Sequence, residues 1–172
     1  NNALGLNTTA SQNTATGATA LYRNTTGTYN TASGYNALYS NNASFNTANG
    51  SYALYSNTTG TENTATGYQA MYNNTTASYN TATGYQSLYS NTTGSHNTAN
   101  GRQALYANTT GTHNTTFGFG SLKNNTTGIW NTILGYAAGD NITTGSSNII
   151  IGASVDAPSA TASNQLNIGG WI

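Results

Sequence analysis

The sequence has no cysteine and very little charge. Without cysteine, the chain can form neither a disulfide framework nor a thiolate metal site. Only 3% of its residues are charged. The cations are Arg23, Arg102 and Lys123, and the acids are Glu62, Asp140 and Asp156. Such a chain offers no basic track to nucleic acid and no polybasic patch to a membrane surface, so the sequence argues against both partners.

Long hydrophobic runs are also missing. No apolar stretch approaches the roughly 18 residues of a membrane-spanning helix, so we expect no membrane insertion. Leu, Ile, Val and Phe are scarce, which is typical of disordered chains, but those chains carry a high net charge and this one has a formal net charge of zero. A near-neutral, β-rich surface favours association with other chains.

The most informative feature of the sequence is a repeat. Asn63 to Ala70 reads N-T-A-T-G-Y-Q-A, and Asn80 to Ser87 reads N-T-A-T-G-Y-Q-S. An asparagine opens each copy, and successive copies are 17 residues apart, with one spacing of 16. These asparagines are Asn13, Asn30, Asn46, Asn63, Asn80, Asn97, Asn114, Asn131 and Asn148. A period this short predicts a stack of near-identical rungs rather than a globular fold around one active site.

Comparison of the copies shows which positions face inward. Numbered from its asparagine, the consensus rung is N-T-A-T-G-Y-Q-A-L-Y-S-N-T-T-G-S-Y. Position three is alanine up to Ala99 and then becomes Thr116, Ile133 and Ile150. Position nine is occupied by Leu21, Leu38, Leu54, Met71, Leu88, Leu105 and Leu122. Steady apolar positions predict the interior of the coil, and drifting polar positions, such as position four, predict its exterior.

The pattern predicts an all-β fold. Two short segments, T-A-T and Y-Q-A-L-Y, alternate with glycine and with N-T-T-G, which is typical of strands separated by turns. A 17-residue repeat fits one turn of a parallel β-solenoid or β-roll. We expect residues 1–152 to form this solenoid. Residues 153–172 are expected to form an irregular link around Pro158 and a terminal strand, with Trp171 capping the stack or joining it to a further fibre segment.

Alternation in the second predicted strand suggests a contact between chains. If leucine at position nine points inward, the small residue at position eight and the tyrosine at position ten point outward together. A strand with two organised faces is usually covered on both. We therefore expect this Ala/Tyr face to pack against another copy of the chain, the alternative being an exposed tyrosine ladder. The tyrosines are Tyr22, Tyr39, Tyr55, Tyr72, Tyr89 and Tyr106.

Asparagine also recurs at position twelve, from Asn24 to Asn125. At a turn, asparagine tolerates a left-handed backbone and bonds its own main chain. Stacked in register, its amides also bond from rung to rung. The asparagines therefore indicate architecture rather than a ligand site.

The inventory of reactive side chains argues against an enzyme. Glycan-cleaving sites need paired carboxylates, whereas Glu62, Asp140 and Asp156 fall on different rungs. Glu62 occupies position seventeen, a variable position that also contains His96 and His113 on adjacent rungs. Those two rings should lie about 5 Å apart and could hold a metal between chains, but an exposed ladder is the simpler interpretation, and we predict neither a metal nor a cofactor.

Two further features allow other interpretations. Asn-x-Thr recurs in nearly every rung, which is a formal acceptor for glycosylation, although a turn-forming N-T-T-G explains it without sugar. Threonine ladders at positions two and thirteen could order water as an ice-binding face if that face were flat and free of bulky residues.

The last rungs resemble a known class of rung. Asn148-Ile149-Ile150-Ile151-Gly152 is similar to the N-S-V-A-I-G rung of trimeric autotransporter adhesin heads. That resemblance implies a left-handed parallel β-roll in a bundle of three chains. The head repeats are usually shorter, and the N-T-T-G insertion lengthens each rung here.

Essentially the whole chain resembles the N-T-A-T-G-Y-Q-A-L-Y-S-N-T-T-G arrays of bacterial and phage tail-fibre-like proteins. In that family, a segment similar to Asp156–Gly169 leads to a C-terminal intramolecular chaperone, which assembles a trimer and is then cleaved off. Asn7-Thr8-Thr9 also matches the end of a copy whose beginning is absent, so we expect the chain to be part of a longer protein.

Together these features predict a structural or adhesive fibre segment without catalysis, located outside the cell on a cell or virion surface. Its expected partner is itself, as a homotrimer or a filament, with a surface glycan as a further receptor. The alternatives are a glycan-coated extracellular filament that self-assembles, and a solenoid that binds ice or glycans.

Overall fold

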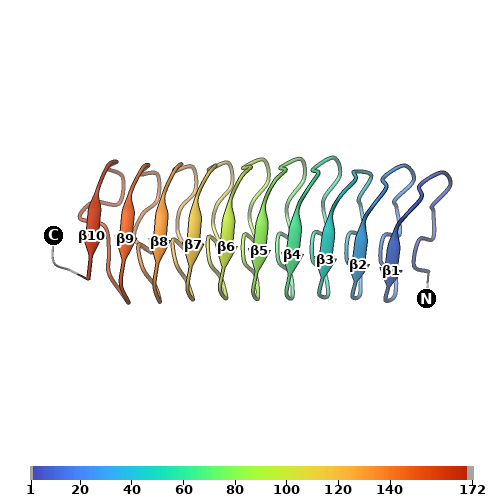
Figure 1. Ribbon diagram of the computed structural model, residues 1–172, viewed down its shortest axis with the longest axis horizontal. Helices are drawn as coiled ribbons and strands as arrows, with labels where there is room; N and C mark the ends of the chain where they lie inside the picture. Colours follow the sequence, from blue (N-terminus) through green and yellow to red (C-terminus); the bar gives the residue numbers. More distant parts are fainter. Residues whose placement is uncertain (1, 170–172) are drawn as a thin grey trace.

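The computed structural model describes residues 2–169 and shows a straight rod with ten short strands in a row (Figure 1). The first and last strands lie at opposite ends of the rod. The strands are β1 (Thr14–Thr16), β2 (Thr31–Ser33), β3 (Thr47–Asn49), β4 (Thr64–Thr66), β5 (Thr81–Thr83), β6 (Thr98–Asn100), β7 (Thr115–Phe117), β8 (Thr132–Leu134), β9 (Ile149–Ile151) and β10 (Leu166–Ile168).

All ten strands form one parallel sheet in sequence order. Equivalent positions lie side by side, so that Thr64 is opposite Thr81 and Ala65 is opposite Ala82. Because neighbouring strands are about 4.8 Å apart, each repeat is one turn of a coil that rises by one strand spacing. The prediction of an all-β parallel solenoid is confirmed. No helix among the described residues is long and apolar enough to cross a membrane.

The 17-residue period continues to the last described strand. Leu166 of β10 lies opposite Ile149 of β9. Gln165 occupies position one of this rung and donates its backbone N–H to Asn148 Oδ1 at 2.9 Å. The predicted terminal strand therefore begins a further rung in the same register, while Trp171, the predicted cap or connection, lies outside residues 2–169.

The segment Y-Q-A-L-Y was predicted as a second strand, and this is wrong. It forms two consecutive turns, in which the Ala70 N–H bonds the Gly67 carbonyl and the Asn74 N–H bonds the Met71 carbonyl. Gln69 and Met71 have φ values of 55° and 53°, far from an extended chain. Side chains alternate between two faces only in an extended chain, and here the turns bring Ala70 and Met71 into the same interior. The small residues of position eight are therefore buried within their own chain and share no outward face with the tyrosines.

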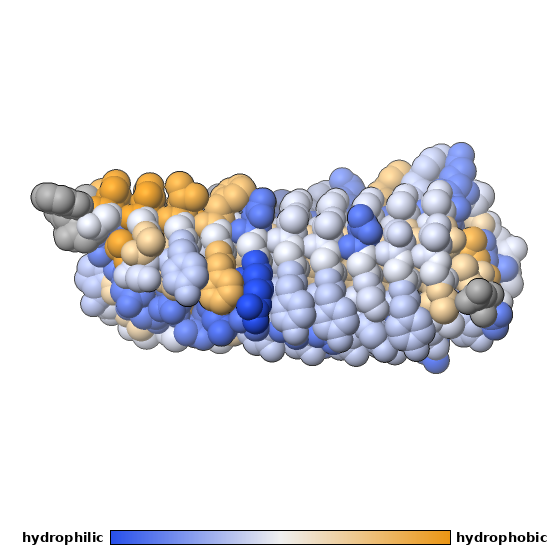
Figure 2. All heavy atoms as spheres, turned by 90° about the horizontal axis from the view of Figure 1, so that it is seen from below, coloured by the Kyte–Doolittle hydropathy of each residue, from blue (hydrophilic) through white to orange (hydrophobic). Residues whose placement is uncertain are grey.

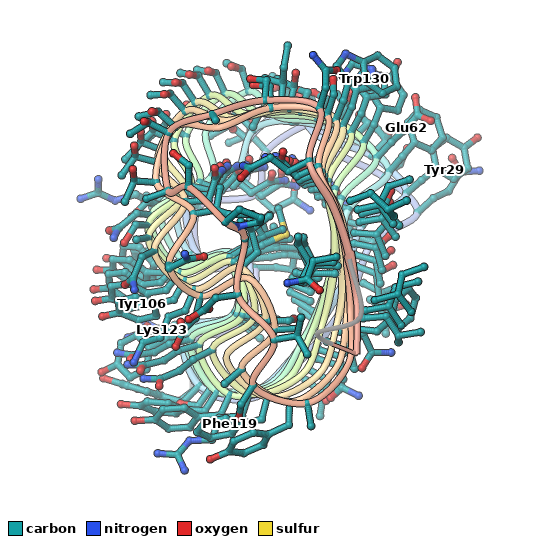
Figure 3. The ribbon with its side chains drawn as sticks, turned by 90° about the vertical axis from the view of Figure 1, so that its left-hand side faces the viewer. Tyr29, Glu62, Tyr106, Phe119, Lys123 and Trp130 are labelled. Carbon is teal, nitrogen blue, oxygen red and sulfur yellow. The ribbon has the colours of Figure 1, made fainter. Side chains whose placement is uncertain are left out.

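The core of the coil is thin but continuous. Each of the middle rungs buries a small residue at positions three and eight, a leucine or methionine at position nine, and two asparagines. Figure 3 looks along the rod and shows these side chains filling the interior.

The core changes composition near the C-terminal end. In the rung of β8, Ile133 replaces the alanine of position three, Gly139 replaces the leucine of position nine, and Ile142 replaces the asparagine of position twelve. A Cβ at Gly139 would lie 3.3 Å from Ile133 Cδ1 and 3.4 Å from Ile142 Cδ1. The two isoleucines therefore occupy the space that a leucine fills in other rungs, and a core that keeps its volume tolerates such exchanges.

Glycine at position five is imposed by the close approach of two rungs. At Gly67, φ is 126°, which side chains rarely adopt, and a Cβ would lie 2.5 Å from the carbonyl oxygen of Gly84 in the next rung. Gly120, at position seven, differs because its φ is 62° and a Cβ there would meet nothing within 4 Å.

We predict that Gly67→Ala lowers the free energy of unfolding by more than about 3 kcal/mol, because it combines backbone strain with a clash against backbone. The matched change Gly120→Ala should cost about 1–2 kcal/mol, because it introduces the strain of a left-handed residue without a clash. Urea unfolding followed by circular dichroism measures both values. Equal effects at the two glycines would contradict the close approach of the rungs.

Candidate functional surfaces

The asparagines of position twelve form a ladder inside the coil. In the middle of the rod, Asn74 Nδ2 donates to Asn57 Oδ1 of the preceding rung at 2.9 Å and to the Ala77 carbonyl of its own rung at 3.0 Å. Its own Oδ1 accepts from Asn91 Nδ2 at 3.0 Å. The ladder runs from Asn24 to Asn125 and ends where Ile142 replaces asparagine.

The asparagines of position one form a second ladder beside the first. Asn63 Oδ1 accepts the backbone N–H of Asn80 at 3.0 Å, and Asn63 Nδ2 donates to the Ala77 carbonyl at 2.8 Å. The asparagines of positions one and twelve thus both donate a hydrogen bond to the backbone carbonyl of position fifteen in their own rung. These asparagines were predicted to stack from rung to rung, and they do. Their backbones are not left-handed, however, since among the non-glycine residues positive φ falls at positions seven, nine and seventeen instead.

Three buried polar atoms among the described residues have no partner: Thr116 Oγ1, Asn125 Oδ1 and His113 Nδ1. Asn125 is the last member of its ladder, so its oxygen has no following amide to accept from. Thr116 places a hydroxyl where neighbouring rungs have Ala99 and Ile133. Unpaired groups of this kind reduce stability because they lose their hydrogen bonds to water.

We predict that Asn74→Ala lowers the free energy of unfolding by about 3 kcal/mol, because it leaves Asn57 Oδ1, Asn91 Nδ2 and a carbonyl short of partners in the interior. The control is Asn124→Ala, which removes an exposed amide whose bond to the Asp140 carbonyl is 2.8 Å long. It should cost well under about 1 kcal/mol. An equal loss of stability for both variants in thermal unfolding would show that the interior ladder contributes no more than an exposed hydrogen bond.

The tyrosines of position ten form a stacked ladder on one flank of the rod. Successive ring centroids are 5.5, 5.3, 5.1, 5.4 and 5.2 Å apart, and the planes are within 16° of parallel. Each ring therefore covers much of its neighbour's face and presents its edge to solvent. All six tyrosines are half-buried within the single chain. Their predicted contact with another chain stays a prediction.

A second aromatic row lies at position six, below the tyrosine ladder in Figure 3. Its larger members are Tyr35, Tyr68, Tyr85, Arg102, Phe119 and Tyr136. Arg102 stands where a ring would stand, with its guanidinium 5.4 Å from the ring centroid of Tyr85 and 5.4 Å from that of Phe119. Sequence reasoning missed this arrangement, although the period alone placed these three residues on consecutive rungs.

A third row, the position-seventeen ledge, projects from another corner of the coil, where Figure 3 labels Tyr29, Glu62 and Trp130. Its ring members are Tyr29, Phe45, Tyr79, His96, His113 and Trp130. The predicted proximity of His96 and His113 is confirmed, with ring centroids 4.7 Å apart. Residues 2–169 contain no group of three or more His, Cys, Asp or Glu side chains placed to hold a metal ion.

The outward face of the sheet is polar over most of its length and apolar at one end. Position two is threonine in eight consecutive strands, from Thr14 to Thr132. At the C-terminal end, large apolar residues replace the polar ones, and Figure 2 shows them as an orange strip along the upper edge on the left. These residues, the apolar strip, are Phe117, Leu134, Ile149, Ile151, Leu166 and Ile168. Five of the six are at least 42% exposed.

The two C-terminal acids lie close together. Partial burial, followed by repulsion from the Asp156 carboxylate and a hydrogen bond with it, raises the pKa of Asp140 above its ordinary value, and Lys123 opposes the shift. Folding therefore favours the protonated form of Asp140. The ionised carboxylate of Asp140 lowers the free energy of unfolding. This loss develops as pH rises from the ordinary aspartate pKa, near 4, through the raised pKa of the folded state.

We predict that Asp140→Asn raises the melting temperature at pH 7 by about 1–2 °C, a small value because the site is largely solvated. The gain should disappear near pH 3, where the carboxylate is protonated in both states. Glu62→Gln, in a rung without a second acid, serves as the control in calorimetry at both pH values. A lower melting temperature for Asp140→Asn at pH 7 would contradict the assignment.

Comparison of the chain with models of protein families, with curated proteins and with solved structures gave no match.

Proposed function

We propose that this chain is a structural and adhesive segment of an extracellular fibre, on a cell or virion surface, and that it acts without catalysis. The proposal rests on the direction of the hydrogen bonds in the rod. The sheet ladder, both asparagine ladders and the threonine hydroxyls of position thirteen all bond from one rung to the next. Bonds along one axis resist extension and bending, which is the mechanical requirement of a shaft.

The resemblance to tail-fibre-like arrays supports the same role and favours a homotrimer over an endless filament. Two surfaces are candidates for the contact between chains: the tyrosine ladder of position ten and the apolar strip on the sheet face. The apolar strip is the better candidate, because its side chains are exposed in the single chain and soluble monomers rarely expose contiguous patches of this kind.

The experiment is sedimentation equilibrium of the chain together with two variants. We expect three times the chain mass for the parent protein. Leu134→Thr/Ile149→Thr, which restores the residue of other rungs, should shift the mass towards that of one chain, whereas Tyr72→Thr/Tyr89→Thr should leave it unchanged. A parent protein that is monomeric at high micromolar concentration would overturn the proposed assembly, and dissociation by the tyrosine variant alone would transfer the contact to the tyrosine ladder.

A second candidate function, ice binding, is favoured by one observation. Threonines of position two line up on the flat sheet face over eight strands, and the tyrosine ladder lies on a different flank. At position thirteen, by contrast, hydroxyls such as that of Thr92 already donate to the next rung. Thermal hysteresis of a freezing solution separates this candidate from a passive shaft.

Glycan binding is supported less well at the tyrosine ladder. Sugars bind aromatic side chains through ring faces, and in this ladder neighbouring tyrosines cover those faces. An open face remains where a ladder ends, as at Trp130, which stacks on His113 with centroids 4.0 Å apart and is followed by Ser147 in the next rung.

A further inference from the structure

The position-seventeen ledge is interrupted at one rung. From Tyr29 to Trp130, every rung places an aromatic ring at this position except the rung that contains Glu62. Glu62 is exposed, and its carboxylate forms no hydrogen bond or ion pair with any described residue. In Figure 3 it projects from the same corner of the coil as Tyr29 and Trp130.

The rings on either side of Glu62 each have one uncovered face. Phe45 stacks on Tyr29 with centroids 5.1 Å apart, and Tyr79 stacks on His96 at 4.9 Å, so each ring is covered on the side away from Glu62. Phe45 and Tyr79 belong to rungs that are two strand spacings apart, which corresponds to about 10 Å. A shallow depression of about 280 Å³ lies on the Phe45 side of this interval, lined by Phe45 and Glu62.

The protein itself shows what fills a gap of this width. In the position-six row, the guanidinium of Arg102 occupies a one-rung gap between two rings, Tyr85 and Phe119. A guanidinium suits such a gap because it is flat, stacks on ring faces and is attracted by their quadrupole. At Glu62 the gap has the same width between rings, but it contains an anion in place of the cation.

We propose that the gap at Glu62 binds an arginine side chain of another protein. The guanidinium pairs with the Glu62 carboxylate, and its flat face lies over the open face of Phe45, with Tyr79 in the next rung beyond Glu62. The gap opens to solvent on the outer side of the ledge, so the aliphatic stem of the arginine leads away from the rod. An exposed ion pair and one stacked ring are each weak, so a single site should bind in the millimolar range.

The test titrates the protein with the peptide acetyl-Gly-Arg-Gly-amide and follows the aromatic NMR resonances of Phe45 and Tyr79. The matched ligand replaces arginine by citrulline, which has the same flat shape without the charge. We expect saturable shifts with the arginine peptide, at least fivefold weaker binding of the citrulline peptide, and weakening of the arginine complex by salt.

Three variants locate the site. Glu62→Gln keeps the depression and removes the charge, so it should weaken binding at least fivefold. Glu62→Tyr completes the row of rings and should abolish binding. Asp156→Asn, which removes an exposed carboxylate away from the ledge, should leave binding unchanged. Circular dichroism confirms that each variant is folded.

Equal binding of the arginine and citrulline peptides would overturn the proposal, as would an unchanged affinity in Glu62→Gln. The site is formed by one chain, so this result does not depend on the oligomeric state measured for the proposed fibre.

Discussion

The structure depends on one constraint, which is that equivalent side chains lie directly above one another at the spacing of neighbouring strands. A side chain placed in such a column must be compatible with copies of itself. The amide of asparagine meets this condition because it donates and accepts at once, so Asn57, Asn74 and Asn91 pair in sequence without leaving a group unsatisfied. Glycine at position five meets it differently, since only hydrogen fits between its backbone and the carbonyl of the next rung. The aromatic side chains meet it by stacking.

This constraint explains why most of the fold could be predicted. The period specifies which residues share a column, so the parallel register and the contact of His96 with His113 followed from spacing, and comparison of the copies identified the inward alanines of position three and leucines of position nine. The apolar strip was also present as a signal, because positions two and four of the last rungs change from polar residues to phenylalanine, leucine or isoleucine.

The path of the chain within one rung could not be predicted in the same way. Repetition relates one rung to the next, but it carries no information on the backbone angles inside a rung. Methionine and glutamine rarely adopt positive φ, and nothing in their identity indicated that Met71 and Gln69 would do so. They do so here because the turns bury positions eight and nine together, and in most rungs both positions are apolar. For this reason the tyrosines of position ten and the small residues of position eight were predicted to share one outward face, whereas the residues of position eight lie inside the coil.

The stacking of equivalent side chains inside the coil is tested most directly by hydrogen exchange of the asparagine side-chain amides, measured by NMR. Amides of the interior ladders, such as those of Asn57, Asn74 and Asn91, should exchange far more slowly than the amide of Asn124, which is exposed. If the asparagines stack inside the coil, exchange should be slow at all ladder positions, with loss of protection only at the ends of the rod. Uniformly fast exchange of these amides would contradict this stacking, because it would place the asparagines in water rather than stacked inside the coil.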